Sequence, residues 1–110
     1  NRPKLKVSFH DALQKTEELL ISACKYRMVS DVPVGVFLSG GYDSSTVSAI
    51  LQKHSGQTIK TFSIGFYEDQ YNEANHARTI ANHLGTDHNE QYCSVDEAKS
   101  IIPDLPTIYD

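Results

Sequence analysis

Apolar residues recur along this chain with two different periods, which predict helices in some segments and strands in others. In the first part the apolar positions are four and seven residues apart, at Phe9, Leu13, Leu20, Cys24 and Met28. This spacing predicts an amphipathic helix over about residues 11–28, capped by Ser8 with Asp11. Polar residues and Pro33 then break the pattern before the next apolar run.

Strands and helices alternate in the rest of the chain. Residues 34–38, 60–66 and 89–93 are rich in β-formers and predict strands. Residues 44–53 and 73–84 have helical spacing, Gly85 suits a helix C-terminus, and Ser94 with Glu97 predicts a capped helix that Pro103 ends. This order predicts an α/β fold with a parallel sheet, right-handed crossovers and helices on both faces.

Composition narrows the function classes. The 110 residues suffice for one small domain, and the net charge of -4 disfavours nucleic acid or an anionic membrane as a partner. No apolar run approaches the roughly 20 residues that cross a bilayer. Cys24 and Cys93 lie far apart and form no CxxC pair, so two reduced thiols in a cytoplasmic protein are expected.

The most informative segment is SGGYDSS, residues 39–45, directly after the first predicted strand. In an open parallel sheet, ligands bind beyond the carboxyl ends of the strands, where the strand order switches. Gly40 and Gly41 leave room for a ligand, and the amides of a following helix N-terminus suit phosphate oxygens. The alternative is a simple turn in which Asp43 or Ser44 caps the helix.

Asp43 predicts that a metal ion binds together with the phosphate. A carboxylate beside phosphates is unfavourable unless a cation lies between them, so Asp43 predicts Mg²⁺. The segment has neither the lysine of the GxxxxGK[ST] loop nor the spacing of GxGxxG. His76, His83 and His88 are too widely spaced to predict a zinc site, and both cysteines are expected to be structural.

Three longer segments give the chain a family resemblance: DVPVGVFLSGGYDSS, IKTFSIGF and EANHARTIANHLGTDHNE. Together they resemble the synthetase domain of glutamine-dependent asparagine synthetases, which belong to the ATP pyrophosphatases that share an SGGxDS loop. The resemblance covers about residues 9–110. It implies a fold of the ATP pyrophosphatase type, here cut to about three strands. Residues 1–110 are then expected to be the N-terminal part of a longer synthetase domain, without its C-terminal half and without the glutaminase domain, and the isolated fragment is expected to be inactive.

The resemblance also implies a reaction and a set of binding residues. Such enzymes activate the side-chain carboxylate of aspartate with Mg-ATP, release pyrophosphate, and let ammonia from a glutaminase domain displace AMP from aspartyl-AMP. The implied phosphate-binding residues are Ser39, Gly40, Gly41, Asp43, Ser44 and Ser45, with Asp43 also on Mg²⁺. Leu38 and Ile64 match positions that contact adenosine, Ile64 through its backbone, although core packing explains both equally well.

Some features depart from the family or stay open. Tyr42 replaces the usual aliphatic residue of the loop, and Asp110 matches the start of a family segment that the sequence does not continue. Glu73 and Arg78 match family positions, but an exposed pair at this spacing is usually solvated surface. A related adenylating enzyme with another acceptor, such as a β-lactam synthetase, and a non-catalytic nucleotide-binding module are the alternatives. An uncovered sheet edge would favour a homo-oligomer.

Overall fold

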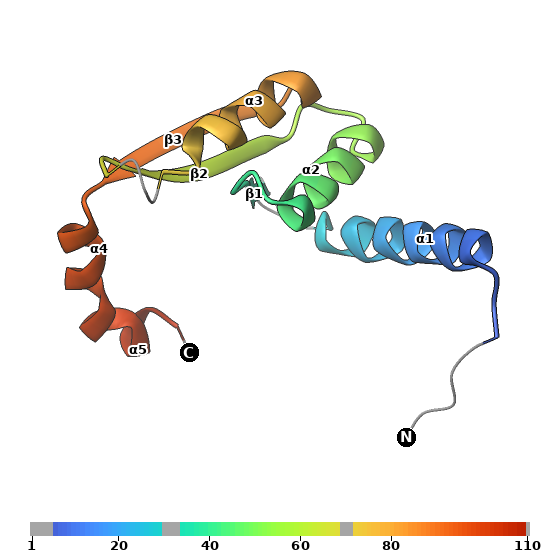
Figure 1. Ribbon diagram of the computed structural model, residues 1–110, viewed down its shortest axis with the longest axis horizontal. Coiled ribbons are helices and arrows are strands. Elements are labelled where there is room, and N and C mark those ends of the chain that lie inside the picture. The colour runs from blue at the N-terminus through green and yellow to red at the C-terminus, as the bar shows by residue number, and fades with distance from the viewer. Residues whose placement is uncertain (1–5, 30–33, 69–71, 110) are drawn as a thin grey trace.

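Three parallel strands alternate with helices in the computed structural model, which describes residues 6–29, 34–68 and 72–109 (Figure 1). The elements, in chain order, are α1 (Phe9–Arg27), β1 (Gly35–Phe37), α2 (Tyr42–His54), β2 (Lys60–Phe66), α3 (Ala74–Leu84), β3 (Asp87–Cys93), α4 (Val95–Ile101), the 3-10 helix η2 (Ile102–Asp104) and α5 (Leu105–Ile108). The predicted α/β class is confirmed. The residues expected to separate α1 from β1, and Asp110, lie outside the described ranges.

The strands follow their chain order in the sheet, β1-β2-β3, and both pairs are parallel. Phe37 pairs with Phe62 at the end of β1, whereas β2 continues beside β3 as far as Phe66 and Cys93. The strand order does not reverse among the described strands, so these strands do not contain the switch point expected beside residues 39–45. The pairing of β1 with β2 therefore ends at Phe62, two residues before Ile64.

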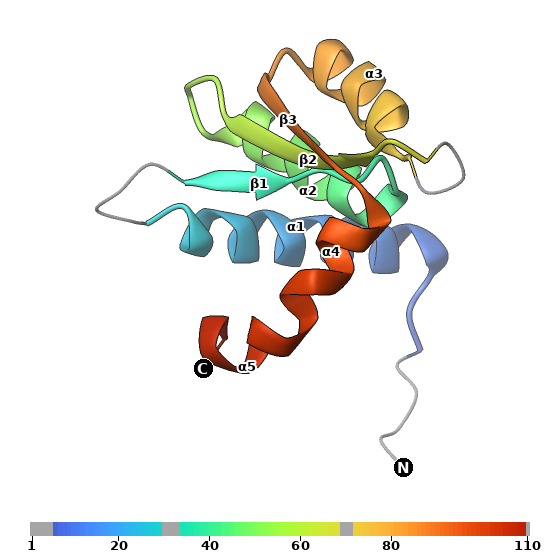
Figure 2. The same ribbon diagram turned by 90° about the vertical axis from the view of Figure 1, so that its left-hand side faces the viewer.

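The two faces of the sheet differ in burial. On β2, Thr61, Ser63 and Gly65 are buried, and α3 packs over them against β2 and β3, while α2 packs against α3 and α1. The opposite face carries Phe37 and Ile64, which are 78% and 56% exposed. Helices were expected on both faces of the sheet. Within the described residues they cover one face. In Figure 2, α4 and α5 lead away from the end of β3.

Helix ends follow the predicted capping residues. The Ser8 side chain accepts a hydrogen bond from the amide of Asp11, so α1 begins at Phe9, two residues earlier than predicted. Gly85 ends α3 with a left-handed φ of 70°, and Ser94 and Glu97 form the predicted capping box. α4 ends at Ile101, and Pro103 lies in η2. Local chemistry therefore fixes where these helices start and stop.

The core is small and lies under α3. Leu38, Ala77 and Ala81 form a fully buried cluster, with Ile80 partly buried against it. α1 buries none of its described residues, so its apolar stripe is only partly covered by α2. The small alanine side chains let α3 approach the end of β1 closely, and this approach shapes the site described next.

Candidate functional site

The turn after β1 requires a glycine at position 40. Gly40 has a φ of +87°, a conformation that other residues adopt only with strain. A β-carbon built there would lie 2.9 Å from Cβ of His76 and 3.1 Å from the backbone nitrogen of Ala77. Both backbone conformation and space thus exclude a side chain, and the turn lies directly against the first turn of α3.

Hydrogen bonds of serine side chains stabilise this turn. The Ser39 amide donates to Ser44 Oγ at 3.2 Å, and the two hydroxyl oxygens lie 3.1 Å apart. The Ser44 and Ser45 hydroxyls both donate to the Gly41 carbonyl, at 3.3 and 2.6 Å. The three hydroxyls expected to meet phosphate are therefore engaged with the turn, which leaves backbone amides as the free donors.

Those amides belong to the N-terminus of α2. Gly41 is the N-cap and receives no side-chain cap, and the first intrahelical bond runs from the Ser45 amide to the Gly41 carbonyl. The amides of Tyr42, Asp43 and Ser44 precede that bond and lie at the positive end of the helix dipole. Neither Asp43 nor Ser44 is the cap, so the alternative of a simple capped turn was wrong in its residue assignment.

Asp43 offers an exposed carboxylate in the first turn of α2. It makes no hydrogen bond or ion pair with another side chain in the part of the chain that the structure describes. Tyr42 beside it is 95% exposed, so the residue that departs from the family pattern does not pack into the turn. The carboxylate is free to meet a cation.

An open pocket of about 220 Å³ adjoins the turn. Its lining residues come from the ends of β1 and β2 and the start of α3: Phe37, Leu38, Ser39, Phe62, Ser63, Ile64, Phe66, Glu73 and Ala74. Leu38, Ser39 and Ile64 of the predicted site thus share one pocket, while residues 40–45 continue from its edge into α2. Leu38 also belongs to the core, so its packing role is confirmed, while its contact with adenosine stays a prediction.

The backbone of Ile64 faces this pocket. The Leu38 amide donates to the Phe62 carbonyl at 2.8 Å, so the polar backbone groups of Phe62 point toward β1. Ile64 is two residues further along β2, and its N–H and C=O therefore point to the same side. The pairing of β1 with β2 has ended there, which leaves a strand edge beside the pocket.

Ser63 joins the turn to the middle strand. Its buried side chain donates a hydrogen bond to the Leu38 carbonyl, the last group before the serine-glycine turn. Sequence reasoning missed this contact, although a serine at an inward position of a buried strand was a visible signal. Buried hydroxyls need partners, and here the partner is the chain segment that leads into the turn.

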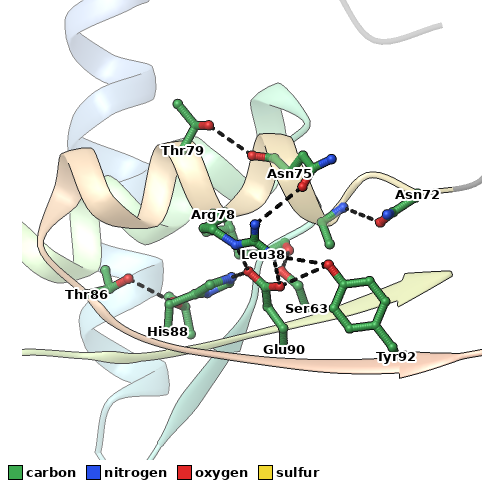
Figure 3. A network of polar contacts seen from close by, with 12 residues as sticks. Leu38, Ser63, Asn72, Asn75, Arg78, Thr79, Thr86, His88, Glu90 and Tyr92 are labelled. Atoms are coloured by element: carbon green, nitrogen blue, oxygen red, sulfur yellow. Dashed lines mark hydrogen bonds and ion pairs between the residues drawn. The ribbon is translucent and has the colours of Figure 1, made fainter. Parts of the chain in front are cut away.

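Sequence reasoning also missed a polar cluster between α3 and β3. Glu90 of β3 accepts from Arg78 Nε at 2.7 Å and Nη2 at 2.5 Å, and from the Tyr92 hydroxyl at 3.2 Å (Figure 3). The paired Arg78 guanidinium holds the pKa of Glu90 below its usual value. Arg78 is exposed, as expected, but it is not merely solvated, because it binds Glu90, twelve residues away, rather than Glu73.

Other candidate residues remain separate. Glu73 lies at the start of α3 and lines the pocket, whereas His76, His83 and His88 do not converge. Among the described residues, no group of three or more histidine, cysteine, aspartate or glutamate side chains could hold a metal ion. Cys24 and Cys93 are free thiols. None of the described helices is both long and apolar enough to span a bilayer.

Comparisons with known proteins agree on one family. The family model for asparagine synthase matches residues 15–110. A Methanocaldococcus jannaschii protein, named as a glutamine-hydrolysing asparagine synthetase, is 38% identical over 99 residues, which cover 89% of this chain and 19% of that protein. Asparagine synthetase B of Escherichia coli K12 is 35% identical over 101 residues, covering 80% of this chain and 18% of that enzyme.

These relatives are much longer than the sequence, which spans about a fifth of their length. Within that span the match includes the turn, the pocket and the Arg78–Glu90 cluster. The chain belongs to the asparagine synthase family.

Proposed function

We propose that this chain forms the ATP-binding part of an enzyme that makes asparagine from aspartate and glutamine-derived ammonia. The observation that carries the proposal is the turn at Gly40. It puts an uncapped helix N-terminus beside a pocket at which the described pairing of β1 with β2 has ended. Phosphates and a nucleoside need these two features side by side.

In the proposed site the triphosphate lies on the turn and the first turn of α2. The amides of Tyr42, Asp43 and Ser44 donate to the β- and γ-phosphate oxygens, and Gly40 and Gly41 let the backbone approach them. The hydroxyls of Ser39, Ser44 and Ser45 keep the turn in shape, as their present hydrogen bonds indicate. Rotation of these hydroxyls adds donors when phosphate arrives.

The donor set fits magnesium. Mg²⁺ takes few protein carboxylates together with phosphate oxygens, and Asp43 presents a single exposed carboxylate next to the phosphate-binding amides. When bound, the ion neutralises charge on the phosphates and on the leaving pyrophosphate. Asp43 is the described residue that would hold it.

The nucleoside occupies the pocket in this proposal. Leu38 and Ile64 contact adenosine, and the Ile64 N–H and C=O pair with the edge of adenine because they face the pocket past the end of β1. The apolar side chains around them exclude water from one side of the nucleotide.

The reaction follows from where the α-phosphate then lies, between turn and pocket. An oxygen of the aspartate side-chain carboxylate attacks the α-phosphorus, the bond to the bridging oxygen breaks, and pyrophosphate leaves with that electron pair. Ammonia, which a glutaminase domain of the same protein supplies, then attacks the acyl carbon. The bond from that carbon to the AMP oxygen breaks, AMP leaves with the electron pair, and the new amide nitrogen releases one proton. The residues described here bind and orient the nucleotide, and none of them is assigned a proton transfer.

The test is aspartate-dependent exchange of labelled pyrophosphate into ATP by the full-length protein. Gly40→Ala should lower exchange at least about 100-fold, because the new methyl group meets α3 and strains the turn. Gly56→Ala is the matched control, since Gly56 has a similar φ of +71° and open space around it. Exchange that does not depend on aspartate, or equal loss in both variants, would overturn the proposal.

A further inference from the structure

The polar cluster around Glu90 is the best-defined feature that the proposed binding site does not use. Glu90 is only 14% exposed and receives the Arg78 guanidinium through two hydrogen bonds, one on each carboxylate oxygen. The Tyr92 hydroxyl donates to one of these oxygens and lies 3.1 Å from Arg78 Nη2. Such charge-assisted, two-point pairs fix geometry as well as charge.

The cluster continues into the middle of the sheet. His88 Nε2 lies 3.5 Å from Glu90 Oε1, and its side chain is 8% exposed. On the other side of the ring, His88 Nδ1 lies 2.9 Å from the hydroxyl of the fully buried Thr61 of β2. The Glu90 carboxylate thus joins side chains of α3 and β3, as Figure 3 shows, and His88 beside it contacts Thr61 of β2 through its other ring nitrogen.

The first turn of α3 borders both parts of the proposed ATP site, the phosphate turn and the nucleoside pocket. Gly40 of the phosphate turn lies against His76 and Ala77, and the nucleoside pocket is bounded by Glu73 and Ala74. Arg78 follows directly after these residues on α3. Any shift of α3 on the sheet would therefore move the wall of the pocket relative to the phosphate turn.

We propose that Arg78 and Glu90 are positioning residues that set the spacing between the phosphate turn and the nucleoside pocket. This inference rests on the proposed function, since it assumes that ATP spans the two. Neither residue lines the 220 Å³ pocket or lies in the turn, so each acts through the placement of α3. ATP requires the correct spacing, whereas pyrophosphate occupies the turn alone.

The test compares two ligands in the full-length protein. Affinities for Mg-ATP and Mg-pyrophosphate are measured by calorimetry for the wild type and for Glu90→Gln, which keeps the shape of the side chain and removes its charge. We expect the dissociation constant for ATP to rise about tenfold and that for pyrophosphate to change less than about twofold. The turn keeps its own serine hydrogen bonds, which explains the difference.

Two further variants test whether a general loss of structure, and not the loss of this pair, explains a change in affinity. Glu18→Gln makes the same chemical change in the exposed Lys15–Glu18 pair of α1 and should alter neither affinity. Arg78→Lys keeps the positive charge but loses the two-point contact, and the Arg78 side chain is 49% exposed, so this variant should fold. It should show the same selective loss of ATP affinity, and adding Glu90→Gln to it should cost little more, because the pair acts as a unit.

The outcomes separate the two proposals. Equal loss for ATP and pyrophosphate, or unchanged affinities in Glu90→Gln and Arg78→Lys, overturns the positioning role. If Gly40→Ala abolishes ATP binding while both cluster variants keep the wild-type ratio of affinities, the proposed function stands and this inference falls. A wild-type protein that binds neither ligand overturns both.

Discussion

Gly40 and Ala77 meet so closely that a β-carbon on Gly40 would lie 3.1 Å from the Ala77 backbone nitrogen. Ala77 is completely buried, and its small side chain permits this approach of α3 to the turn after β1. The contact joins the turn between β1 and α2 to the first turn of α3. It explains why the turn carries glycine and why α3 forms part of the proposed site.

The first prediction concerns magnesium. Asp43→Asn should raise the Mg²⁺ concentration needed for half-maximal pyrophosphate exchange by about tenfold or more, because the carboxylate is the proposed protein ligand. A Mg²⁺ titration at fixed ATP measures this. The control is Asp96→Asn, which changes another exposed acid in the first turn of a helix, remote from the phosphate turn. An unchanged Mg²⁺ requirement in Asp43→Asn would contradict the assignment.

The second prediction concerns Ser63. Its hydroxyl donates to the Leu38 carbonyl in the interior, so Ser63→Ala should lower the free energy of unfolding by about 1 kcal/mol and weaken ATP binding. Urea denaturation and calorimetry measure the two effects. Ser100→Ala removes an exposed hydroxyl that donates to the Glu97 carbonyl, and it should change neither quantity. A Ser63→Ala protein with wild-type stability would show that the contact contributes nothing.

The third prediction concerns pH. Arg78 holds the pKa of folded Glu90 below its usual value of 4.5, so the ionised carboxylate stabilises the folded state above that value. This stabilisation is lost as the pH falls from about 4.5 through the lower folded pKa. The difference in unfolding free energy between wild type and Glu90→Gln should therefore be constant near neutral pH and shrink in acid. A difference that stays constant down to about pH 2 would refute the ion pair as its source.

The fourth prediction concerns the exposed sheet face. The 110-residue chain by itself should self-associate, because Phe37 and Ile64 leave an apolar surface uncovered on that face. Sedimentation equilibrium at increasing concentration measures the association. Phe37→Ser should weaken it, whereas Tyr26→Ser should not, since Tyr26 is equally exposed but lies on α1. A wild-type chain that stays monomeric at high concentration would contradict the prediction.

Local signals in the sequence were enough to predict most of the fold. β2 has the predicted limits, residues 60–66, because its run of aromatic and β-branched residues favours an extended strand. Gly85 and the Ser94–Glu97 pair act within one helical turn, so capping chemistry alone located those helix ends. α2 begins two residues before its prediction, since Gly41 rather than a serine or aspartate is its N-cap.

The candidate site was only partly accessible from sequence. SGGYDSS is contiguous, and its position after a strand predicted the turn. Glu90, Arg78 and Tyr92 meet from two different elements, so no local spacing revealed their contact. The short β1, which exposes the Ile64 backbone to the pocket, likewise depends on pairing between distant segments.

One measurement tests the proposed ATP site most directly. The full-length protein, labelled with ¹⁵N in glycine and isoleucine, is titrated with Mg-pyrophosphate and with Mg-ATP and followed by NMR. The amides of Gly40 and Gly41 should shift saturably with both ligands, and that of Ile64 with ATP alone. These shifts should weaken in Asp43→Asn. A folded protein in which neither ligand moves the two glycine amides would contradict the assignment of this turn as the phosphate site.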